Sequence, residues 1–418
     1  MKAVVAIPEV AGLLCEEQAS EILMRPVAGV PLLMRTILTA VKAGASDILL
    51  VCPMALSARL LERFTAELVR RGVKVTALHV ADFNPRAASG WLILKPYLEE
   101  QFVWLPWNWV TIKQSIVQLP LVKLEFVDWS KPAFTTLHEV DREIASRPLS
   151  LRSAGGISIS SQNSVMAAER FLVANSGKSS DGIHTSFNRR LCRPFVRLIS
   201  HTGITANTIT FGGVVISILS AFALAKGTYL WSVLGAILFY IAGLFDEMDG
   251  MLARIKFAES PWGTWLEGAA DGLSYLFLFG GITIGLSRHY GRIAVWMGIV
   301  LLIGSVLALI TTSLQRRRAT TYDRPNEYLG RIYQLLEKDS GNWISRVVRQ
   351  VQGFQRRGIL IHYIVIFTVL GLLPLVFALA TIGAHLTWIL TLYFNRRFFS
   401  TSSRSGVQSL GSNLKEAL

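Results

Sequence analysis

The stretch that decides how this chain is read is Asp246-Glu247-Met248-Asp249-Gly250-Met251-Leu252-Ala253-Arg254, followed by Gly263, Glu267 and Asp271. Its spacing is D-x2-D-G-x2-A-R-x8-G-x3-E-x3-D, and it lies in strongly apolar sequence. Carboxylates are costly inside a membrane, so acidic residues in such surroundings predict a functional site. The two aspartates at the start are three residues apart and the last two acids are four apart, so each pair projects from one helical face.

Two neighbouring helices of this kind could direct four carboxylates into one cavity. Four anions so close together need cations between them, and hard oxygen ligands suit Mg²⁺ or Mn²⁺. We therefore expect two divalent cations, which would leave room for phosphate oxygens during phosphoryl transfer. A lone intramembrane Asp would equally fit a helix-packing contact or a proton relay, but the whole pattern favours the metal site. Glu247 lies off the acidic face, and we expect it to be solvated.

Small and basic residues follow the first acidic pair. Gly250 and Ala253 would let a ligand or a neighbouring helix approach the backbone closely. Arg254 is placed to neutralise a phosphate, and Gly263 begins the next apolar segment close to the same cavity.

Composition divides the chain into a soluble part and a membrane part. Of the 418 residues 51% are hydrophobic, and the long apolar runs are concentrated in residues 204–400. The net charge of +14 comes from basic residues that flank apolar segments, which indicates membrane orientation and anionic lipid, and we expect no nucleic-acid partner. The three cysteines are far apart without metal-ligand spacing, as in an ordinary cytosolic domain: Cys15, Cys52 and Cys192.

Strand-like and helix-like patterns alternate near the N-terminus. Strands are predicted over Ala3–Ile7, Asp47–Cys52 and Val73–Val80, and helices over Pro31–Ala43 and Ala55–Arg71. This alternation predicts an α/β domain with a Rossmann-like, mostly parallel sheet. We also predict strands over Phe102–Leu105 and Leu121–Phe126, a loop over Gly155–Ser161, a helix over Ser164–Asn175 and a polar connector over Gly177–Gly182.

Residues 186–200 form a basic amphipathic pattern. One face is apolar and carries Phe187, Leu191, Phe195, Leu198 and Ile199. Another carries an arginine every fourth residue, at Arg189, Arg193 and Arg197. A helix of this kind lies in the membrane interface with its guanidinium groups toward phosphates.

Six apolar spans follow, near residues 205–225, 229–251, 263–286, 293–314, 359–379 and 381–399. Each is long enough to cross a bilayer, so we expect an all-α polytopic membrane domain. The loop 315–358 carries ten Lys and Arg residues, whereas the loops on the other side carry few. The positive-inside rule then places both termini, the soluble domain and the acidic cluster on the cytoplasmic side of a cell inner or cytoplasmic membrane.

Four regions result. Residues 1–177 are a cytosolic domain, 178–203 a connector with the interfacial helix, 204–400 the membrane domain and 401–418 a polar tail.

The acidic pattern resembles that of the CDP-alcohol phosphotransferase family, D-x2-D-G-x2-A-R-x8-G-x3-D-x3-D, with every spacing in agreement. One residue departs, because Glu267 stands where the family has Asp. Thr205-Ala206-Asn207 is similar to the Thr-Pro-Asn that begins the family's first span, and the resemblance covers roughly residues 178–400.

The resemblance implies a transferase of phospholipid biosynthesis. An acceptor alcohol would attack the β-phosphorus of a CDP-alcohol, often CDP-diacylglycerol, and CMP would leave. By position the residues that hold two metal ions would be Asp246, Asp249, Glu267 and Asp271. Asp271 would also be the catalytic base. The cytidine-diphosphate pocket would be lined by Asp249, Gly250, Ala253, Arg254, Gly263 and Asn207. Family members commonly form homodimers, so we expect a homodimer. The identity of the acceptor alcohol is left open.

The N-terminal part resembles sugar-phosphate nucleotidyltransferases, through the segment Met24–Leu33. Its catalytic parts depart from that pattern: the Gly-rich loop after Ile7 is lost, the activating Lys is Arg25, and Asn108 stands near where a metal-binding Asp belongs. We expect this domain to be inactive. Two alternatives stay open: a bifunctional enzyme that also makes its own CDP-alcohol, and a non-enzymatic membrane scaffold or transporter.

Overall fold

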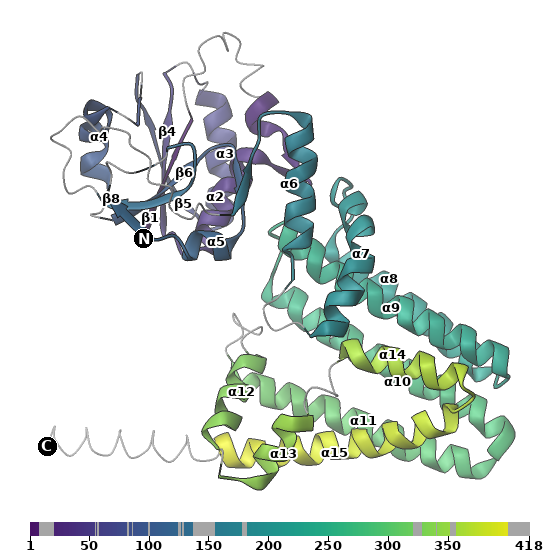
Figure 1. Ribbon diagram of the computed structural model, residues 1–418. Coiled ribbons are helices and arrows are strands. Elements are labelled where there is room, and N and C mark those ends of the chain that lie inside the picture. The colour runs from purple at the N-terminus through teal and green to yellow at the C-terminus, as the bar shows by residue number, and fades with distance from the viewer. Residues whose placement is uncertain are drawn as a thin grey trace, which may run out of the picture. The chain divides into compact units, whose positions relative to one another are not determined.

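Figure 1 shows the computed structural model of the chain. It describes residues 1–7, 21–54, 56, 58–81, 83–85, 87–98, 101–123, 127, 129–136, 155–177, 182–320, 328–339, 341–351 and 357–399. The chain divides into two compact units. The first comprises Met1–Ser176, Arg197–Gly203 and Ile255–Phe257, and the second comprises Gly177–Val196, Ile204–Arg254 and Ala258–Leu418.

A six-stranded sheet forms the centre of the first unit. Its order is β5 (Lys74–His79), β4 (Asp47–Cys52), β1 (Lys2–Ala6), β6 (Gln101–Pro106), β9 (Ala133–Thr136) and β8 (Leu121–Lys123). The first four strands run parallel, β9 is antiparallel to β6, and β8 is parallel to β9. The prediction of a mostly parallel α/β sheet is therefore confirmed. Residues 124–126 of the last predicted strand lie outside the described residues.

Helices cover both faces of this sheet. Along β1, Ala3 and Val5 belong to one buried cluster and Val4 and Ala6 to the other, as expected where successive side chains point to opposite faces. α2 (Leu32–Lys42) and α3 (Ala58–Arg70) cover the first face, and α4 (Ala88–Leu94) covers the second (Figure 1). Burial on both faces explains why the strands are nearly continuous apolar runs.

The loop predicted over Gly155–Ser161 is partly wrong. Gly156–Ser158 form a short strand, β10, paired antiparallel with β7 (Trp109–Thr111). The Trp109 indole passes so close to Gly156 that a Cβ there would overlap it, so the glycine is needed for the pairing. Side-chain propensity does not reveal such a strand, because Gly and Ser are depleted in strands generally.

Short elements complete the unit. They are β2 (Pro26–Val27), β3 (Val30–Pro31), η1 (Lys95–Tyr97), α5 (Lys113–Val117) and α6 (Gln162–Ala174). α6 confirms the helix predicted from Ser164, and it begins with a capping box between Ser161 and Ser164. Buried Glu169 on α6 accepts a hydrogen bond from the Ala28 amide at 3.1 Å and pairs with Arg197 at 3.5 Å.

The second unit is helical. Its elements are α7 (Ile183–Ser200), α8 (Ala206–Ala225), α9 (Tyr229–Ile255), α10 (Pro261–Tyr290), α11 (Arg292–Ala319), α12 (Tyr328–Lys338), α13 (Trp343–Val351), α14 (Arg357–Val369) and α15 (Leu373–Phe399). Among the described residues, five helices are long and apolar enough to cross a membrane: α8, α9, α10, α11 and α15. A multi-pass membrane protein is indicated, while the predicted count of six spans is not confirmed.

The last two predicted spans are divided at the wrong place. The predicted break near residue 380 falls inside α15, and the turn lies instead between α14 and α15. Gly371 has a φ of +75° there, and the Leu372 amide donates to the Phe367 carbonyl at 2.8 Å. A left-handed glycine with this bond ends a helix, and Pro374 is tolerated in the first turn of the next one.

Close helix packing leaves an apolar outer surface on the second unit. α8 packs against α10 so tightly that a Cβ on Gly285 would overlap the Leu224 carbonyl. The outer face of α8 exposes an apolar stripe whose ends, Phe211 and Phe222, are 70% and 67% exposed. Such a continuous apolar surface is rare on a soluble protein and is typical of a lipid-facing helix.

α7 confirms the predicted amphipathic helix, although it begins three residues earlier, at Ile183. Its apolar face is exposed, as expected. Two of its arginines are engaged within the protein, because Arg189 donates to Glu247 at 2.9 Å and Arg197 pairs with Glu169. The expectation that Glu247 is solvated is therefore wrong: the side chains of Arg189 and Glu247 are only 11% and 14% exposed.

Candidate active site

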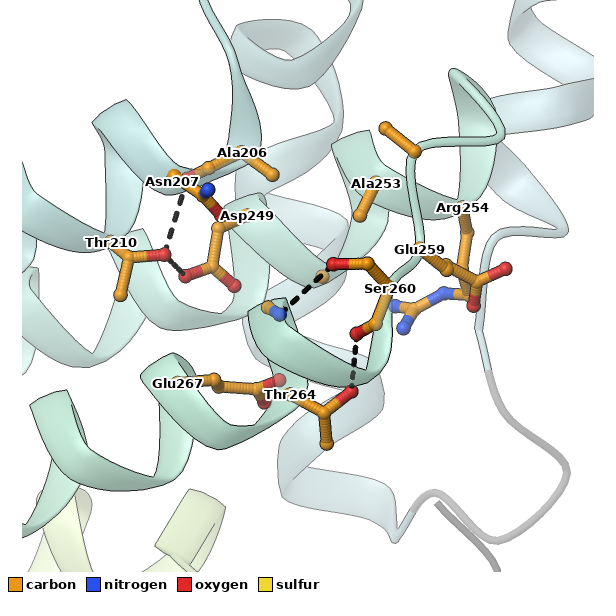
Figure 2. A pocket seen from close by; sticks show the side chains of 13 residues that line it. Ala206, Asn207, Thr210, Asp249, Ala253, Arg254, Glu259, Ser260, Thr264 and Glu267 are labelled. Atoms are coloured by element: carbon orange, nitrogen blue, oxygen red, sulfur yellow. Dashed lines mark hydrogen bonds between the residues drawn. The ribbon is translucent and has the colours of Figure 1, made fainter. Parts of the chain in front are cut away.

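A pocket opens in the second unit where α8 and α10 begin and α9 ends (Figure 2). Because these three ends meet, the pocket lies near one end of three candidate membrane spans. It holds about 490 Å³ of empty space, a volume that includes space open to solvent. It is lined by Ala206, Asn207, Thr210, Asp249, Gly250, Ala253, Arg254, Ala258, Glu259, Ser260, Gly263, Thr264 and Glu267.

The last turns of α9 supply the deepest acidic group. Asp249, which is only 4% exposed, shares a helical face with Ala253, one turn later. The Thr210 hydroxyl of α8 donates a hydrogen bond to its Oδ2, as Figure 2 shows. The guanidinium of Arg254 lies over Gly250, where a Cβ would be 3.3 Å from Nη1. The carboxylate and the guanidinium are thus both held at the pocket.

The first turn of α8 forms another wall. Thr205 caps this helix, because its hydroxyl accepts a hydrogen bond from the Thr208 amide at 3.2 Å. Asn207 and Thr210 then follow three residues apart and line the same side. The cap leaves the amides of the first turn near the pocket.

The first two turns of α10 form the third wall. Ser260 caps the helix by accepting from the Gly263 amide at 2.9 Å, and Pro261 occupies the first helical position. Gly263 and Glu267, one turn apart, face the pocket. A Cβ on Gly263 would lie 3.1 Å from the Ser260 hydroxyl and 3.9 Å from Asn207 Oδ1, so a larger residue would crowd the meeting point of the two helices.

Charges of both signs meet in this pocket. The N-termini of α8 and α10 carry partial positive charge and, with Arg254, favour a bound anion such as a phosphate. Asp249, Glu259 and Glu267 are negative and favour a cation. The arrangement therefore suits an anionic ligand that is bound together with cations, as a nucleoside diphosphate is.

Seven of the predicted site residues line this one pocket: Asn207, Asp249, Gly250, Ala253, Arg254, Gly263 and Glu267. The other two, Asp246 and Asp271, are half-buried on α9 and α10 and are not among the lining residues. Asp246 and Glu267 nevertheless lie near enough to Asp249 for their charges to interact with its carboxylate.

Whether the carboxylates of the pocket fit a divalent cation depends on their donor atoms and on their arrangement. Asp249 and Glu267 offer the oxygen donors that Mg²⁺ and Mn²⁺ prefer, and Asp246 adds a third charge close by. The part of the chain that the structure describes contains no group of three or more His, Cys, Asp or Glu side chains arranged to hold one metal ion. The donor chemistry fits a divalent cation, and the two-metal arrangement stays a prediction.

Several lining residues were not predicted: Ala206, Thr210, Ala258, Glu259, Ser260 and Thr264. Two of them carried a usable signal. Thr210 is one helical turn after Asn207, and Ser260 directly precedes a proline, which is typical of a helix cap. The others lack such a signal, because only the meeting of three helix ends brings them to the pocket.

Fold and pocket together define a polytopic membrane protein with an acidic site at the ends of its helices. The family model described as CDP-alcohol phosphatidyltransferase matches residues 203–337, roughly a third of the chain. The chain thus carries a domain of this family of transferases, whose substrates are CDP-alcohols and alcohols in a membrane context. No curated protein matches the chain. The match does not reach residues 1–202, so the nucleotidyltransferase resemblance of the N-terminal part stays a prediction.

Proposed function

We propose that the chain is a membrane phosphotransferase, which moves a substituted phosphate from a CDP-alcohol such as CDP-diacylglycerol to an acceptor alcohol and releases CMP. One observation carries the proposal: six residues of the acidic pattern, on α9 and α10, line one pocket with Asn207 of α8 within the matched family domain. Its charges suit a diphosphate that is bound with cations.

The roles of the pocket residues follow from their positions. The amides at the start of α8 and α10, with Arg254, would hold the diphosphate oxygens. Thr210 would orient the carboxylate of Asp249. Asp271, one turn after Glu267 on α10, would accept the proton of the acceptor hydroxyl. Asp246, Asp249, Glu267 and Asp271 would hold divalent cations, which would stabilise the charge that develops on the phosphates.

Replacement of Asp249 by Asn tests the proposal. Asp249→Asn keeps the size of the side chain but removes its charge, so CMP release from CDP-diacylglycerol with Mg²⁺ or Mn²⁺ should be abolished. Chelation by EDTA should also abolish CMP release. Return of the metal should restore CMP release by the wild-type protein but not by Asp249→Asn. Glu337→Gln, which neutralises an exposed carboxylate on α12, should behave as wild type. CMP release that survives both Asp249→Asn and EDTA would refute the assignment.

A non-enzymatic membrane protein is the second candidate, because two of the four carboxylates do not line the pocket and Glu267 departs from the family pattern. Glu267→Asp distinguishes the two. An active parent enzyme whose metal preference shifts in Glu267→Asp supports a working site. A parent that releases no CMP and gains activity in Glu267→Asp supports a decayed one.

The remaining expectations are part of the same proposal. The positive-inside rule favours a cytoplasmic first unit and a cytoplasmic active site, and the family commonly forms homodimers. We also propose that the first unit is catalytically inactive and that the chain divides near residue 177, with the membrane domain from 204 to 400.

A further inference from the structure

The segment between α11 and α14 contains a helical hairpin, made of α12 and α13. It belongs to the second unit, and none of its described residues is among those that line the pocket. Its composition is basic, and the proposed transfer reaction uses none of its residues.

This hairpin is firmly attached to the end of α15. The Asp339 carboxylate accepts two hydrogen bonds from Arg397, both at 2.7 Å, and one from the Ser345 hydroxyl at 2.7 Å. Asn342 donates to the Tyr393 hydroxyl, also at 2.7 Å. The orientation of the hairpin on α15 is therefore fixed by directed polar contacts.

The inner side of the hairpin is also fixed by apolar packing. Ile332 and Leu336 of α12 form a buried cluster with Phe394 of α15 and Ala319, the last residue of α11. Both α11 and α15 are candidate membrane spans, and the hairpin is attached where each of them ends. The hairpin consequently lies at the level where the hydrocarbon core gives way to head groups.

The outer sides of the two helices differ. Among the side chains of α12 that the structure describes, the large exposed ones are polar: Arg331, Gln334, Glu337 and Lys338. α13 exposes Trp343 and Val347, which are one turn apart and 69% and 45% exposed. Arg346 and Arg349 are exposed on the adjoining face of α13, and α13 contains no acidic residue.

We propose that α13 lies in the membrane interface and binds anionic phospholipid. Trp343 and Val347 would enter the boundary of the acyl chains, where tryptophan is enriched, and Arg346 and Arg349 would contact lipid phosphates. The opposite charges of α13 and the lipid support this partner, as does the attachment of the hairpin to the ends of two spans. The exposed polar side chains of α12 face water.

Fluorescent labels on the two helices test the position of α13. Full-length protein with Cys15→Ser would carry a single added cysteine, either Val347→Cys on α13 or Gln334→Cys on α12 as the matched control. Cys52 and Cys192 are buried, and burial raises the pKa of both thiols to about 12, so they react slowly at neutral pH. An environment-sensitive label is attached, and the protein is placed in nanodiscs that contain nitroxide-labelled acyl chains.

The label at position 347 should emit at shorter wavelength than the label at 334 and should be quenched by the acyl-chain nitroxide. The label at 334 should be unaffected. Equal, water-like emission from both positions would overturn the proposal. Disulfide cross-linking between two copies of Val347→Cys without lipid quenching would also overturn it, because it would show a protein partner in place of lipid.

A second measurement tests the lipid charge. Arg346→Gln with Arg349→Gln should lower the number of phosphatidylglycerol molecules retained from mixed phosphatidylcholine–phosphatidylglycerol nanodiscs, whereas Arg331→Gln on α12 should retain the wild-type number. Inorganic phosphate should not displace the lipid. Unchanged retention in the double variant, or displacement by inorganic phosphate, would overturn the assignment of these arginines to lipid.

Discussion

At the scale of single residues, the candidate site depends on how Asp249 is held. Its carboxylate is almost fully buried, and it accepts a hydrogen bond from Thr210 on a different helix. A buried acidic group with a partner of this kind has a defined orientation, which a ligand for a metal or a phosphate requires. The acidic pattern predicted Asp249, whereas only the structure showed its partner.

Thr210→Val should weaken catalysis without removing it. The substitution keeps the shape of the side chain but deletes the hydroxyl, so the Asp249 carboxylate loses its orienting bond. Loss of such a supporting contact costs about 10–100-fold in metal affinity or activity. CMP release by Thr210→Val, measured against Mn²⁺ concentration, should require more metal than the wild-type enzyme does. Thr210→Ser, which keeps a hydroxyl, should have the wild-type metal requirement. An unchanged metal dependence in Thr210→Val would contradict the positioning role.

At the scale of elements, a buried ion pair joins α7 to α9. Arg189 and Glu247 are separated by 2.9 Å, and both side chains are less than a sixth exposed. Removing one partner of a buried pair leaves the other charge without compensation, whereas replacing both with apolar residues is often nearly neutral. The pair therefore holds α7 against α9, at a point on α9 that lies within the acidic pattern.

Arg189→Met should lower the free energy of unfolding of the second unit by about 3–5 kcal/mol, because Glu247 would stay buried and lose its ion pair with the Arg189 guanidinium. Arg189→Met combined with Glu247→Leu should recover much of the loss. Denaturant unfolding in detergent, followed by helical circular dichroism, measures both. A double variant that is as unstable as the single one would show that the arginine stabilises by packing alone.

The hairpin of α12 and α13 should be insensitive to moderate acid. Hydrogen bonds from Arg397 and then Ser345 hold the pKa of Asp339 well below its usual range. A lowered folded-state pKa contributes stability fully above the ordinary value of about 4, and this contribution is lost only as the pH falls further. Once corrected for the slower intrinsic exchange of amides at lower pH, the protection of residues 328–339 and 341–351 from hydrogen exchange should therefore match at pH 7 and pH 5.

Asp339→Asn is the control for that prediction. It removes the ion pair with Arg397 at every pH, so exchange in the hairpin should be faster than in the wild-type protein already at pH 7. Exchange in α10, which does not contact the hairpin through this pair, should stay unchanged. If Asp339→Asn exchanged at the wild-type rate, the carboxylate would not be what attaches the hairpin to α15.

At the scale of the whole molecule, the chain combines an α/β unit with a helical membrane unit. The first unit has the predicted parallel sheet, but Asn108 donates hydrogen bonds to Ser158 and to the Ile159 carbonyl, both at 3.2 Å. It is thus engaged in joining β7 to β10, near the place where a nucleotidyltransferase would hold a metal. The segment 8–20, where a phosphate-binding loop was expected to be lost, lies outside the described residues.

The whole chain should therefore release no pyrophosphate when it is incubated with CTP and sugar phosphates. The same preparation should release CMP from a CDP-alcohol, which shows that it is folded and active. Pyrophosphate formed above the level of a protein-free blank would establish the bifunctional alternative and refute an inactive first unit.

The sequence by itself determined the local features, because these depend on periodicity and on spacing along a helix. Alternating apolar runs predicted the parallel strands, and long apolar runs predicted most of the spans. The full acidic pattern predicted six of the residues that line the pocket, and the Thr-Ala-Asn segment added Asn207. The errors arose where an outcome depends on long-range contacts. β10, which lies in a Gly/Ser-rich segment, forms because it pairs with β7. The turn at Gly371 depends on a left-handed backbone conformation that the neighbouring residues do not predict.

Only the tertiary structure decided which distant side chains meet. It paired Glu247 with Arg189, gave Asp249 its hydroxyl donor, and brought Ser260 and Glu259 to the pocket. These contacts join residues on different helices, or depend on how three helix ends converge. Spacing along one helix carries no information about the side chains that a second helix presents, so such pairs are settled only by packing.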